Sequence, residues 1–223
     1  MPGMETVNRL VAENIFVSVG GRQIVANAVI ALSKGHITGL LGSNGSGKST
    51  MLKAIFGTQK ADDIDIHWNA KSVRNLYTIN GLINYLPQWN FLPHNMKLRT
   101  ALKHYKIDLA KILNDFPELE QGLQGRIFET SGGRERLWST LIMIYAATKF
   151  TMLDEPFTHL APLHVEKLKE ILLREKKNKG ILITDHMYRH LLDVSEELYL
   201  MTEGKSIFIK DTAQLALHHY LKS

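Results

Sequence analysis

The sequence contains no cysteine. This absence excludes a disulfide framework, thiolate catalysis, and zinc or iron–sulfur sites that depend on cysteine ligands. Long apolar runs are also absent. The first sixteen residues include Glu5 and Glu13, so we expect no signal peptide. No stretch approaches the roughly 18 apolar residues that a membrane-spanning helix needs, and we therefore expect any membrane role to require partner proteins.

Charge of one sign is only slightly in excess, with 27 Lys and Arg against 22 Asp and Glu. The basic residues are scattered, and their one dense run, REKKNK at 174–179, predicts the solvated end of a helix. We therefore expect no nucleic-acid binding, although a basic chain keeps it as an alternative. The apolar fraction of 44% suffices for a sizeable core, and the longest apolar stretch, LIMIYAA at 141–147, predicts a buried helix.

Short β-like segments alternate with helical ones, which predicts an α/β protein with a mostly parallel sheet. Its predicted strands are 37–41, 82–86, 150–153, 180–184 and 197–201. The segments NIFVSVGGRQIVANAVIAL and DIDIHWNA predict an N-terminal antiparallel portion with a hairpin at Gly20-Gly21. Helical periodicity replaces the β pattern after Gln88. We therefore expect one domain over 1–223, with an α/β core at 1–88 and 148–223 and an inserted helical subdomain at 89–147.

The stretch GLLGSNGSGKST contains the strongest local motif. Gly42, Gly47, Lys48 and Ser49 satisfy the pattern G-x-x-x-x-G-K-[ST] between an apolar strand-like run and a helical segment. Glycines in this loop let backbone N–H groups turn inward around phosphate oxygens at a helix N-terminus. Lys48 adds a positive charge at the β- and γ-phosphates, and the Ser49 hydroxyl can ligate Mg²⁺. The motif predicts that a nucleoside triphosphate binds here.

A pair of carboxylates follows a later apolar run, KFTMLDEPF, which ends in Asp154 and Glu155. Adjacent carboxylates at the carboxyl end of a parallel strand lie where ligands bind such sheets. We expect Asp154 to hold the Mg²⁺ shell and Glu155 to polarise the attacking water as general base.

Two other predicted strands also end in polar residues. GILITDHMYRH delivers Asp185 and His186, and His186 could donate a hydrogen bond to the γ-phosphate. His186 and His190 have i, i+4 spacing, which leaves a metal pair as an alternative. INYLPQWN delivers Gln88, whose carboxamide could touch Mg²⁺, orient water, or merely cap a turn.

Taken in order, these pieces resemble the ATP-binding cassette (ABC) ATPase family. GSNGSGKST, the Gln88 that follows YLP, SGGRER, LDEPF and TDH match that family's phosphate loop, Q-loop, signature, carboxylate motif and switch histidine. The resemblance spans nearly the whole chain, and DEPF and ILITDHMYRHLLDV look most like the lipopolysaccharide-export and branched-chain amino-acid cassettes. It implies a P-loop NTPase core and a Mg²⁺-dependent ATPase that powers transport.

The resemblance also implies partners. The family's cassettes form a head-to-tail dimer, a homodimer or a paired cassette, in which each ATP lies between the phosphate loop of one subunit and the signature of the other. The helix that follows the signature, expected at 134–148, would supply its dipole. Integral-membrane permease subunits would contact the helical part and the region after Gln88. We therefore expect the chain in the cytoplasm, peripheral on the inner face of the cell membrane.

The expected site residues form three groups, which share two members. The expected catalytic residues are Glu155, His186 and Gln88. The expected Mg²⁺ ligands are Ser49, Gln88 and Asp154. The expected contacts to ATP are Gly42, Ser43, Asn44, Gly45, Ser46, Gly47, Lys48, Ser49, Thr50, Ser131, Gly132 and Gly133.

Three positions depart from the family pattern. Val19 stands where the family usually stacks adenine on an aromatic ring, Thr130 replaces the leucine that opens the signature, and Ala161 replaces the D-loop aspartate. These departures keep open a binding or regulatory module that dimerises on ATP with little hydrolysis. A cassette acting on nucleic acid or ribosomes and a small-molecule kinase are further alternatives. The sequence indicates neither the transported substrate nor the direction of transport.

Overall fold

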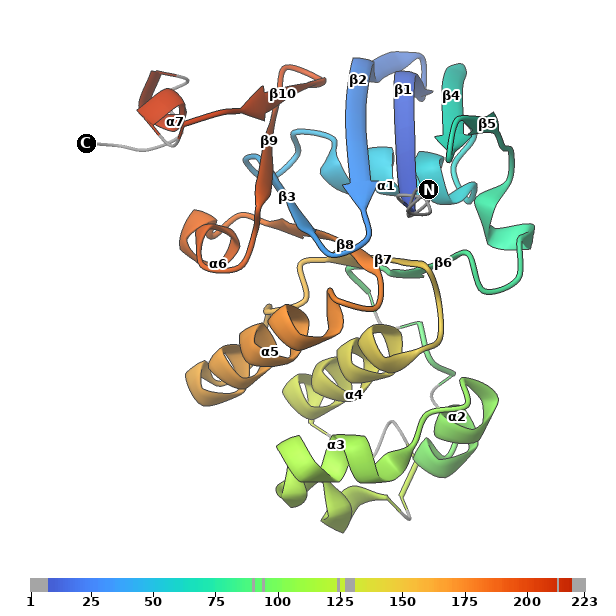
Figure 1. Ribbon diagram of the computed structural model, residues 1–223, viewed down its shortest axis with the longest axis vertical. Coiled ribbons are helices and arrows are strands. Elements are labelled where there is room, and N and C mark those ends of the chain that lie inside the picture. Colours follow the sequence, from blue (N-terminus) through green and yellow to red (C-terminus); the bar gives the residue numbers. More distant parts are fainter. Residues whose placement is uncertain are drawn as a thin grey trace, which may run out of the picture.

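The computed structural model describes residues 8–89, 91–93, 95–123, 125–126, 131–211 and 213–217. The strands of these residues form an antiparallel sheet and a mostly parallel sheet, and the helices of the middle of the chain lie below them (Figure 1). The predicted α/β class is therefore confirmed.

The antiparallel sheet has the strand order β2-β1-β4-β5 within the described residues. Its strands are β1 (Arg9–Val19), β2 (Arg22–Ser33), β4 (Asp63–Trp68) and β5 (Lys71–Ser72). Between β1 and β2, Gly20 and Gly21 have φ angles of 57° and 77°. Two consecutive positive φ angles are what a tight hairpin between right-twisted strands requires, so the predicted hairpin is confirmed.

The second sheet has the order β10-β9-β3-β8-β7-β6 within the described residues. Its parallel strands are β3 (Ile37–Leu41), β6 (Ile83–Leu86), β7 (Phe150–Asp154), β8 (Gly180–Asp185) and β9 (Glu197–Thr202), and β10 (Lys205–Ile209) is antiparallel to β9. Each predicted strand of this sheet agrees with the structure to within one residue.

The parallel strands are buried on both faces, and their side chains alternate between two hydrophobic clusters. Leu40 and Leu182 join the cluster beneath the antiparallel sheet, whereas Leu41 and Ile183 join the cluster that faces the helices. Successive side chains of a strand point to opposite faces, so a strand covered on both sides needs an uninterrupted apolar sequence. This is why ITGLL and GILIT lack polar alternation.

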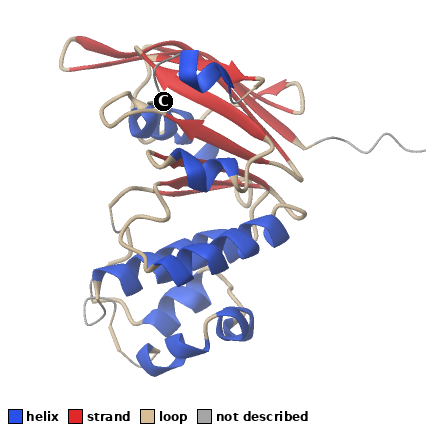
Figure 2. Cartoon of the chain, turned by 90° about the vertical axis from the view of Figure 1, so that its left-hand side faces the viewer, coloured by secondary structure: helices blue, strands red, loops and turns tan. Residues whose placement is uncertain are grey.

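The helices take up most of the remaining chain. On the side of the antiparallel sheet lie α1 (Lys48–Phe56) and the short 3₁₀ helix η1 (Leu76–Thr78), which follows β5 in the chain. The middle of the chain forms α2 (Leu98–His104), α3 (Leu109–Asp115), the 3₁₀ helix η2 (Pro117–Gly122) and α4 (Gly132–Tyr145), followed later by α5 (Pro162–Glu175), α6 (Tyr188–Leu192) and α7 (Ala213–Leu217). Figure 2 shows the strands gathered at one end of the molecule and the longest helices at the other.

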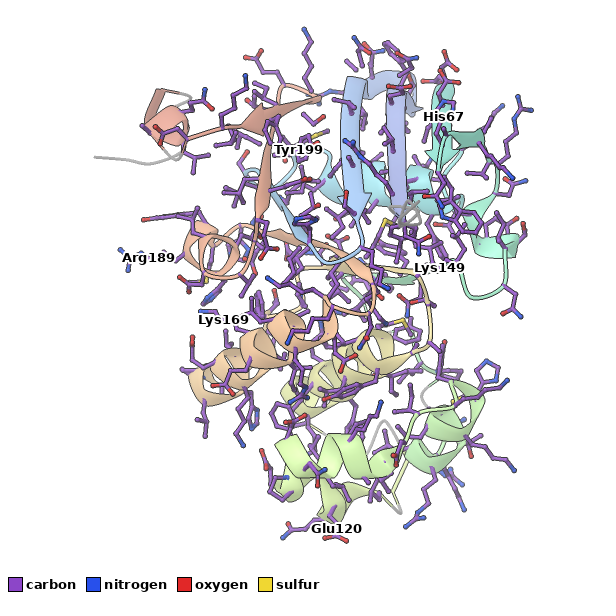
Figure 3. The ribbon with its side chains drawn as sticks, in the orientation of Figure 1. His67, Glu120, Lys149, Lys169, Arg189 and Tyr199 are labelled. Carbon is purple, nitrogen blue, oxygen red and sulfur yellow. The ribbon has the colours of Figure 1, made fainter. Side chains whose placement is uncertain are left out.

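The helical segment shares its core with the parallel sheet. Phe116 of the 3₁₀ junction, Trp138 of α4 and Leu168 of α5 belong to the same buried cluster as Ile37 and Ile183. Glu120 lies at the far end of this segment (Figure 3). The boundaries predicted for a helical subdomain, 89–147, stay a prediction.

The helix after the signature differs from its predicted bounds of 134–148. It begins at Gly132 because the Ser131 side chain caps it by accepting a hydrogen bond from the Arg134 N–H at 3.4 Å. It ends at Tyr145, and the backbone of Ala146 is extended with ψ of 139°. The glycines of the signature therefore form the first turn of the helix instead of preceding it.

The basic run at 174–179 is not wholly solvated, which corrects the prediction. Lys179 is 3% exposed, and its ammonium donates to the carbonyls of Ile144 at 2.7 Å and Ala146 at 2.6 Å. These carbonyls belong to the end of α4, where helical hydrogen bonds run out. Burial lowers the pKa of Lys179 from 10.5 to about 8.

Two labelled lysines in Figure 3 connect segments that are distant in sequence. Lys149 lies over the ring of Trp68 at 5.7 Å and so joins the start of β7 to β4. Lys169 of α5 donates to Asp193 at 2.7 Å and to Glu166 at 2.8 Å.

Within the described ranges, no helix has both the length and the apolarity to cross a membrane.

Candidate functional site

The candidate site lies at the carboxyl ends of four neighbouring parallel strands. In the order β3-β8-β7-β6, these strands lead into the phosphate-loop segment, Asp185, Asp154 and the turn of Gln88 respectively. Carboxyl ends of parallel strands meet at one edge of a sheet. The fold therefore gathers side chains from segments 88, 154 and 185 beside the loop that begins at residue 42.

The phosphate loop joins β3 to α1. Gly47 is the N-cap of α1 with φ of 105°, and it makes no side-chain cap because it has no side chain. The first turn of α1 contains no acidic residue, so the positive end of the helix dipole is not neutralised locally. The Ser46 Oγ atom is buried and has no hydrogen-bond partner among the described residues. These features suit a segment that binds an anion.

Lys48 is buried at the centre of this segment, with 5% of its surface exposed. Its Nζ atom donates to the carbonyls of Gly42 at 2.7 Å and Ser43 at 3.1 Å, so the ammonium braces the loop from inside. Burial lowers the pKa of Lys48, and the opposing attraction comes first from Glu155 and then from Asp154 and Asp185. The lysine therefore stands between the phosphate loop and the carboxylates.

Asp154 is the last residue of β7 and is fully buried. Its Oδ1 atom accepts a hydrogen bond from the Thr184 hydroxyl at 2.6 Å, and its Oδ2 atom accepts one from the Tyr85 hydroxyl at 3.1 Å. Burial raises the pKa of Tyr85, and the neighbouring Asp154 raises it further. The hydroxyl therefore stays protonated and fixes the orientation of the carboxylate.

Glu155 is adjacent to Asp154 but faces a different set of partners. It is 7% exposed, and its Oε2 atom accepts a hydrogen bond from the Gln88 amide at 3.0 Å. Its Oε1 atom lies 3.9 Å from Nδ1 of His186, whose side chain is 45% exposed. The structure thus brings together Gln88, Glu155 and His186, the three residues predicted to be catalytic.

A cavity of about 350 Å³ lies between the phosphate loop and this group. It is lined by Val19, Ile24, Asn44, Gly45, Ser46, Gly47, Lys48, Ser49, Thr50, Gln88 and Glu155. Two aliphatic side chains, Val19 and Ile24, form its wall on the side of the antiparallel sheet. The cavity is large enough for part of a nucleotide, and its polar groups gather at the end where phosphates would bind.

The signature segment lies apart from this cavity, and its residues have unequal surroundings. Ser131 and Gly132 are exposed, and a Cβ atom added to Gly132 would meet no described atom within 4 Å. A Cβ atom added to Gly133 would lie 2.6 Å from the carbonyl oxygen of His159. Gly133 is therefore required by packing inside the chain, whereas packing against the described residues does not explain Gly132.

The ABC transporter family model matches residues 25–158, which is more than half of the chain. The chain belongs to the ABC transporter family. It is an ABC-type ATPase, and the resemblance predicted from its motifs is confirmed.

Individual relatives agree with this assignment. The chain is 31% identical to the lipopolysaccharide export system ATP-binding protein LptB of Escherichia coli K12, over 89% of this chain and 88% of the relative. It is 30% identical to the probable branched-chain amino acid transport ATP-binding protein LivF of Archaeoglobus fulgidus, over 84% and 85% of the two chains. Both cassette groups predicted from DEPF and ILITDHMYRHLLDV are thus represented among its relatives.

Solved structures share the fold of this ABC ATPase. A nucleotide-free ATP-binding cassette from an ABC transporter has a TM-score of 0.73 and 25% identity, over 90% of each chain. The ATP-binding subunit of an ABC transporter has a TM-score of 0.81 over 96% of this chain and 95% of that chain. At 21% identity, the second likeness concerns the fold alone.

The departures from the ABC pattern have different structural settings. Val19 is 48% exposed and lines the cavity. Ala161 is the N-cap of α5 and provides no side-chain hydrogen bond there. Thr130 lies outside the described residues. His190 packs its ring on Phe157 at 5.2 Å, and within the described ranges no three His, Cys, Asp or Glu residues are grouped to hold a metal ion.

Sequence reasoning missed several residues that organise this site. Tyr85 and Thr184 hold Asp154, and Arg136 donates to backbone carbonyls next to it. Thr184 could have been found, because it immediately precedes Asp185 in the strand that neighbours β7. No local sequence signal marks Arg136, which lies between charged and apolar neighbours near the start of α4.

Proposed function

We propose that this chain is the ATP-hydrolysing subunit of an ABC transporter, and that it acts as a dimer beneath separate membrane subunits. One observation carries the proposal: Glu155, held by Gln88, lines the same cavity as Lys48 and the phosphate loop. A carboxylate beside a phosphate-binding loop is the arrangement that phosphoryl transfer to water needs.

In the proposed reaction, the phosphate loop and Lys48 hold the β- and γ-phosphates of ATP. A water molecule attacks the γ-phosphorus while the bond to the bridging oxygen of ADP breaks, and Glu155 takes the proton of the water. The Gln88 amide orients the Glu155 carboxylate through its 3.0 Å hydrogen bond. His186, exposed beside Glu155, would donate to the departing phosphate. The products are ADP and phosphate.

The side chains present also suit Mg²⁺, which prefers a few oxygen ligands together with phosphates. The Gln88 amide nitrogen is engaged with Glu155, so its Oε1 atom is the one that can face a cation. We propose Ser49, Gln88 and Asp154 as the protein ligands. Because the two Asp154 oxygens accept hydrogen bonds from Thr184 and Tyr85, Asp154 would use a remaining lone pair of its carboxylate. When bound, Mg²⁺ supplies charge neutralisation at the β- and γ-phosphate oxygens.

We propose that Ser131, Gly132 and Gly133 bind the nucleotide of a second cassette, to give composite sites in a homodimer or a paired cassette. The exposure of Ser131 and Gly132 supports this proposal, because Ser131 caps α4 at a surface open to a partner. The open space around Gly132 supports it further, since a side chain there would obstruct only a group from outside the described residues. Closure on two ATP molecules and reopening after hydrolysis would then drive transport.

We further propose integral-membrane permease subunits as partners, with the chain in the cytoplasm and peripheral on the inner face of the cell membrane. The relatives named as ATP-binding proteins of lipopolysaccharide export and of branched-chain amino acid transport support this placement. The helical segment 89–147 and the residues after Gln88 are the proposed contact region, which is consistent with Trp89 being 75% exposed.

The proposal is tested by steady-state hydrolysis of Mg-ATP by the purified chain and by its Glu155→Gln variant. We expect turnover in the wild type and a loss of at least about a hundredfold in the variant, because the amide cannot accept the proton. ATP should convert the variant to a dimer that is stable in sedimentation velocity. Normal hydrolysis by Glu155→Gln would refute the assignment of the general base.

The matched control is Glu170→Gln, which removes an exposed carboxylate from α5. Its turnover should equal that of the wild type. The same measurements test the alternative function, which is an ATP-binding module with weak hydrolysis. Two observations favour it: Ala161 gives α5 no side-chain cap, and the aliphatic Val19 lines the cavity. ATP-dependent dimerisation of the wild type without detectable turnover would establish that alternative.

A further inference from the structure

Arg136 carries a positive charge into the interior, directly beneath the candidate site. It lies one turn inside α4, five residues after the Ser131 cap, and only 4% of its surface is exposed. Burial of an arginine is costly unless acceptors compensate the guanidinium, and here Nη1 and Nη2 have acceptors whereas Nε has none among the described residues. Its contacts therefore indicate what the charge is used for.

The guanidinium donates to three backbone carbonyls from two segments of the site. Nη1 donates to the carbonyl of Pro87 at 2.7 Å. Nη2 donates to the carbonyls of Asp154 and Glu155, the latter at 3.0 Å. Arg136 thus binds the residue that precedes Gln88 and both residues of the carboxylate pair, from a helix whose first turn is the signature.

The backbone of Glu155 needs such support. Its φ angle is 52°, in the left-handed region that residues with a Cβ atom adopt only at a cost. On one side, the Glu155 N–H donates to the hydroxyl and the carbonyl of Thr184, each at 3.1 Å. On the other side, its carbonyl accepts from Arg136. The two contacts hold both ends of the residue and so fix the direction in which its side chain leaves the backbone.

We propose that Arg136 is a positioning residue that ties the signature helix α4 to Glu155 and to the turn that carries Gln88. A movement of α4, at whose end Ser131 and Gly132 are exposed, is transmitted through one rigid guanidinium to both partners of the Gln88–Glu155 hydrogen bond. The inference rests on the proposed function, because it assigns Arg136 to the geometry of the hydrolytic site.

The first test compares Arg136→Lys and Arg136→Met by the kcat and KM for Mg-ATP and by the dissociation constant for ATP. Lysine keeps the charge and can reach part of the carbonyl set, whereas methionine keeps an unbranched side chain without donors. We expect kcat to fall at least about tenfold in Arg136→Met and by less in Arg136→Lys, because a small misplacement of a catalytic group is costly. The dissociation constant should stay within about threefold, because the phosphate loop is not contacted.

Arg74→Met is the matched control, since Arg74 is an exposed arginine between β5 and η1, outside the cavity lining and outside the proposed permease contact region. It should keep wild-type kinetics. A kcat within twofold of the wild type in Arg136→Met would overturn the proposal. An equal loss of kcat and ATP affinity in both Arg136 variants, with a parallel fall in thermal stability, would also overturn it and leave Arg136 a purely structural residue.

The second test, hydrogen–deuterium exchange read by mass spectrometry, does not depend on hydrolysis. Arg136→Lys should increase deuterium uptake in peptides covering 84–89 and 153–158 and leave uptake in 42–50 unchanged. Equal uptake in the first two segments, or a uniform increase that includes the phosphate loop, would contradict the proposal. If the wild type does not hydrolyse ATP, the proposed function fails, and this exchange pattern still decides whether Arg136 positions the two segments.

Discussion

The phosphate loop and the signature segment are both glycine-rich stretches that lead into a helix, yet their surroundings in the folded chain differ. The phosphate loop is enclosed: Lys48 bonds to the carbonyls of its own loop, and the loop lines a cavity that the same chain supplies with Gln88 and Glu155. The signature is open on one side, where Ser131 and Gly132 are exposed, and closed on the other, where Gly133 touches His159.

The comparison teaches that a similar composition can serve different needs. The phosphate loop lines a cavity within its own chain, whereas packing against the described residues does not explain a glycine at position 132.

Lys48→Ala tests whether the phosphate loop is the half of the site that acts within the chain. The change removes the buried ammonium that braces the loop beside the cavity and would bind the phosphates, so kcat should fall by about a hundredfold to a thousandfold. The measurement is steady-state hydrolysis of Mg-ATP. Lys53→Ala in the same helix is the control and should retain wild-type turnover. Comparable activity in the two variants would remove the contrast on which the proposed function depends.

Replacing Lys179 tests how much this buried lysine at the C-terminal end of α4 contributes to the free energy of unfolding. Its pKa of about 8 in the folded protein lies below the ordinary value of 10.5, so between these values the unfolded chain binds more protons. The free energy of unfolding contributed by this group should therefore rise with pH, by up to about 3 kcal/mol across the window.

Urea unfolding between pH 7 and pH 10 measures the effect. The wild type should gain stability with pH relative to Lys179→Met, whereas the exposed neighbour variant Lys177→Met should follow the wild-type curve. A constant difference between the wild type and Lys179→Met at every pH would show that Lys179 is not buried as a charge.

Gly132→Ala and Gly133→Ala separate the two halves of the signature itself. The methyl group at 133 would meet the His159 carbonyl, so the free energy of unfolding should fall by about 1–3 kcal/mol. The methyl group at 132 has room in the chain and favours the helix, so stability should stay the same or rise by up to about 1 kcal/mol. Turnover of Gly132→Ala should nevertheless fall, because the methyl group would face the nucleotide of the second cassette. Unaltered turnover in a fully stable Gly132→Ala variant would argue against the composite site.

Val19→Tyr tests whether the cavity beside the phosphate loop lacks an aromatic ring for the adenine on the side of the antiparallel sheet. An aromatic ring at this half-exposed position could stack on the adenine, so ATP should bind about threefold to tenfold more tightly. Isothermal titration calorimetry measures the change. Val29→Tyr, a substitution on β2 outside the cavity lining, should leave affinity unchanged. Weaker binding in Val19→Tyr would mean that the base lies elsewhere.

Much of the fold followed from local patterns. The uninterrupted apolar runs predicted the parallel strands to within a residue, because strands covered on both faces cannot carry polar alternation. The convergence of Gln88, Glu155 and His186 was also predictable, since each follows the end of such a strand.

Other features could not be predicted in this way. Lys179 stood in a run that resembled a solvated helix end, and Arg136 stood between charged and apolar neighbours without any local pattern that marks it as buried. Their burial depends on carbonyls contributed by residues 144, 146, 87 and 154, which only the folded chain brings into reach. The start of α4 at Gly132 likewise depended on the Ser131 cap, which overrides the low helix propensity of glycine.

The alternation of strands and helices, the phosphate loop and the order of the motifs can all be read from the sequence, because each depends on periodicity or on a few adjacent residues. Which charges are buried, and which glycine is needed for packing, becomes visible only in the folded chain. The physical reason is that desolvation and close approach are set by the whole surroundings of a group. Lys48, Arg136 and Lys179 are all buried against backbone carbonyls. Those of Lys48 belong to its own loop, whereas those of Arg136 and Lys179 come from distant segments.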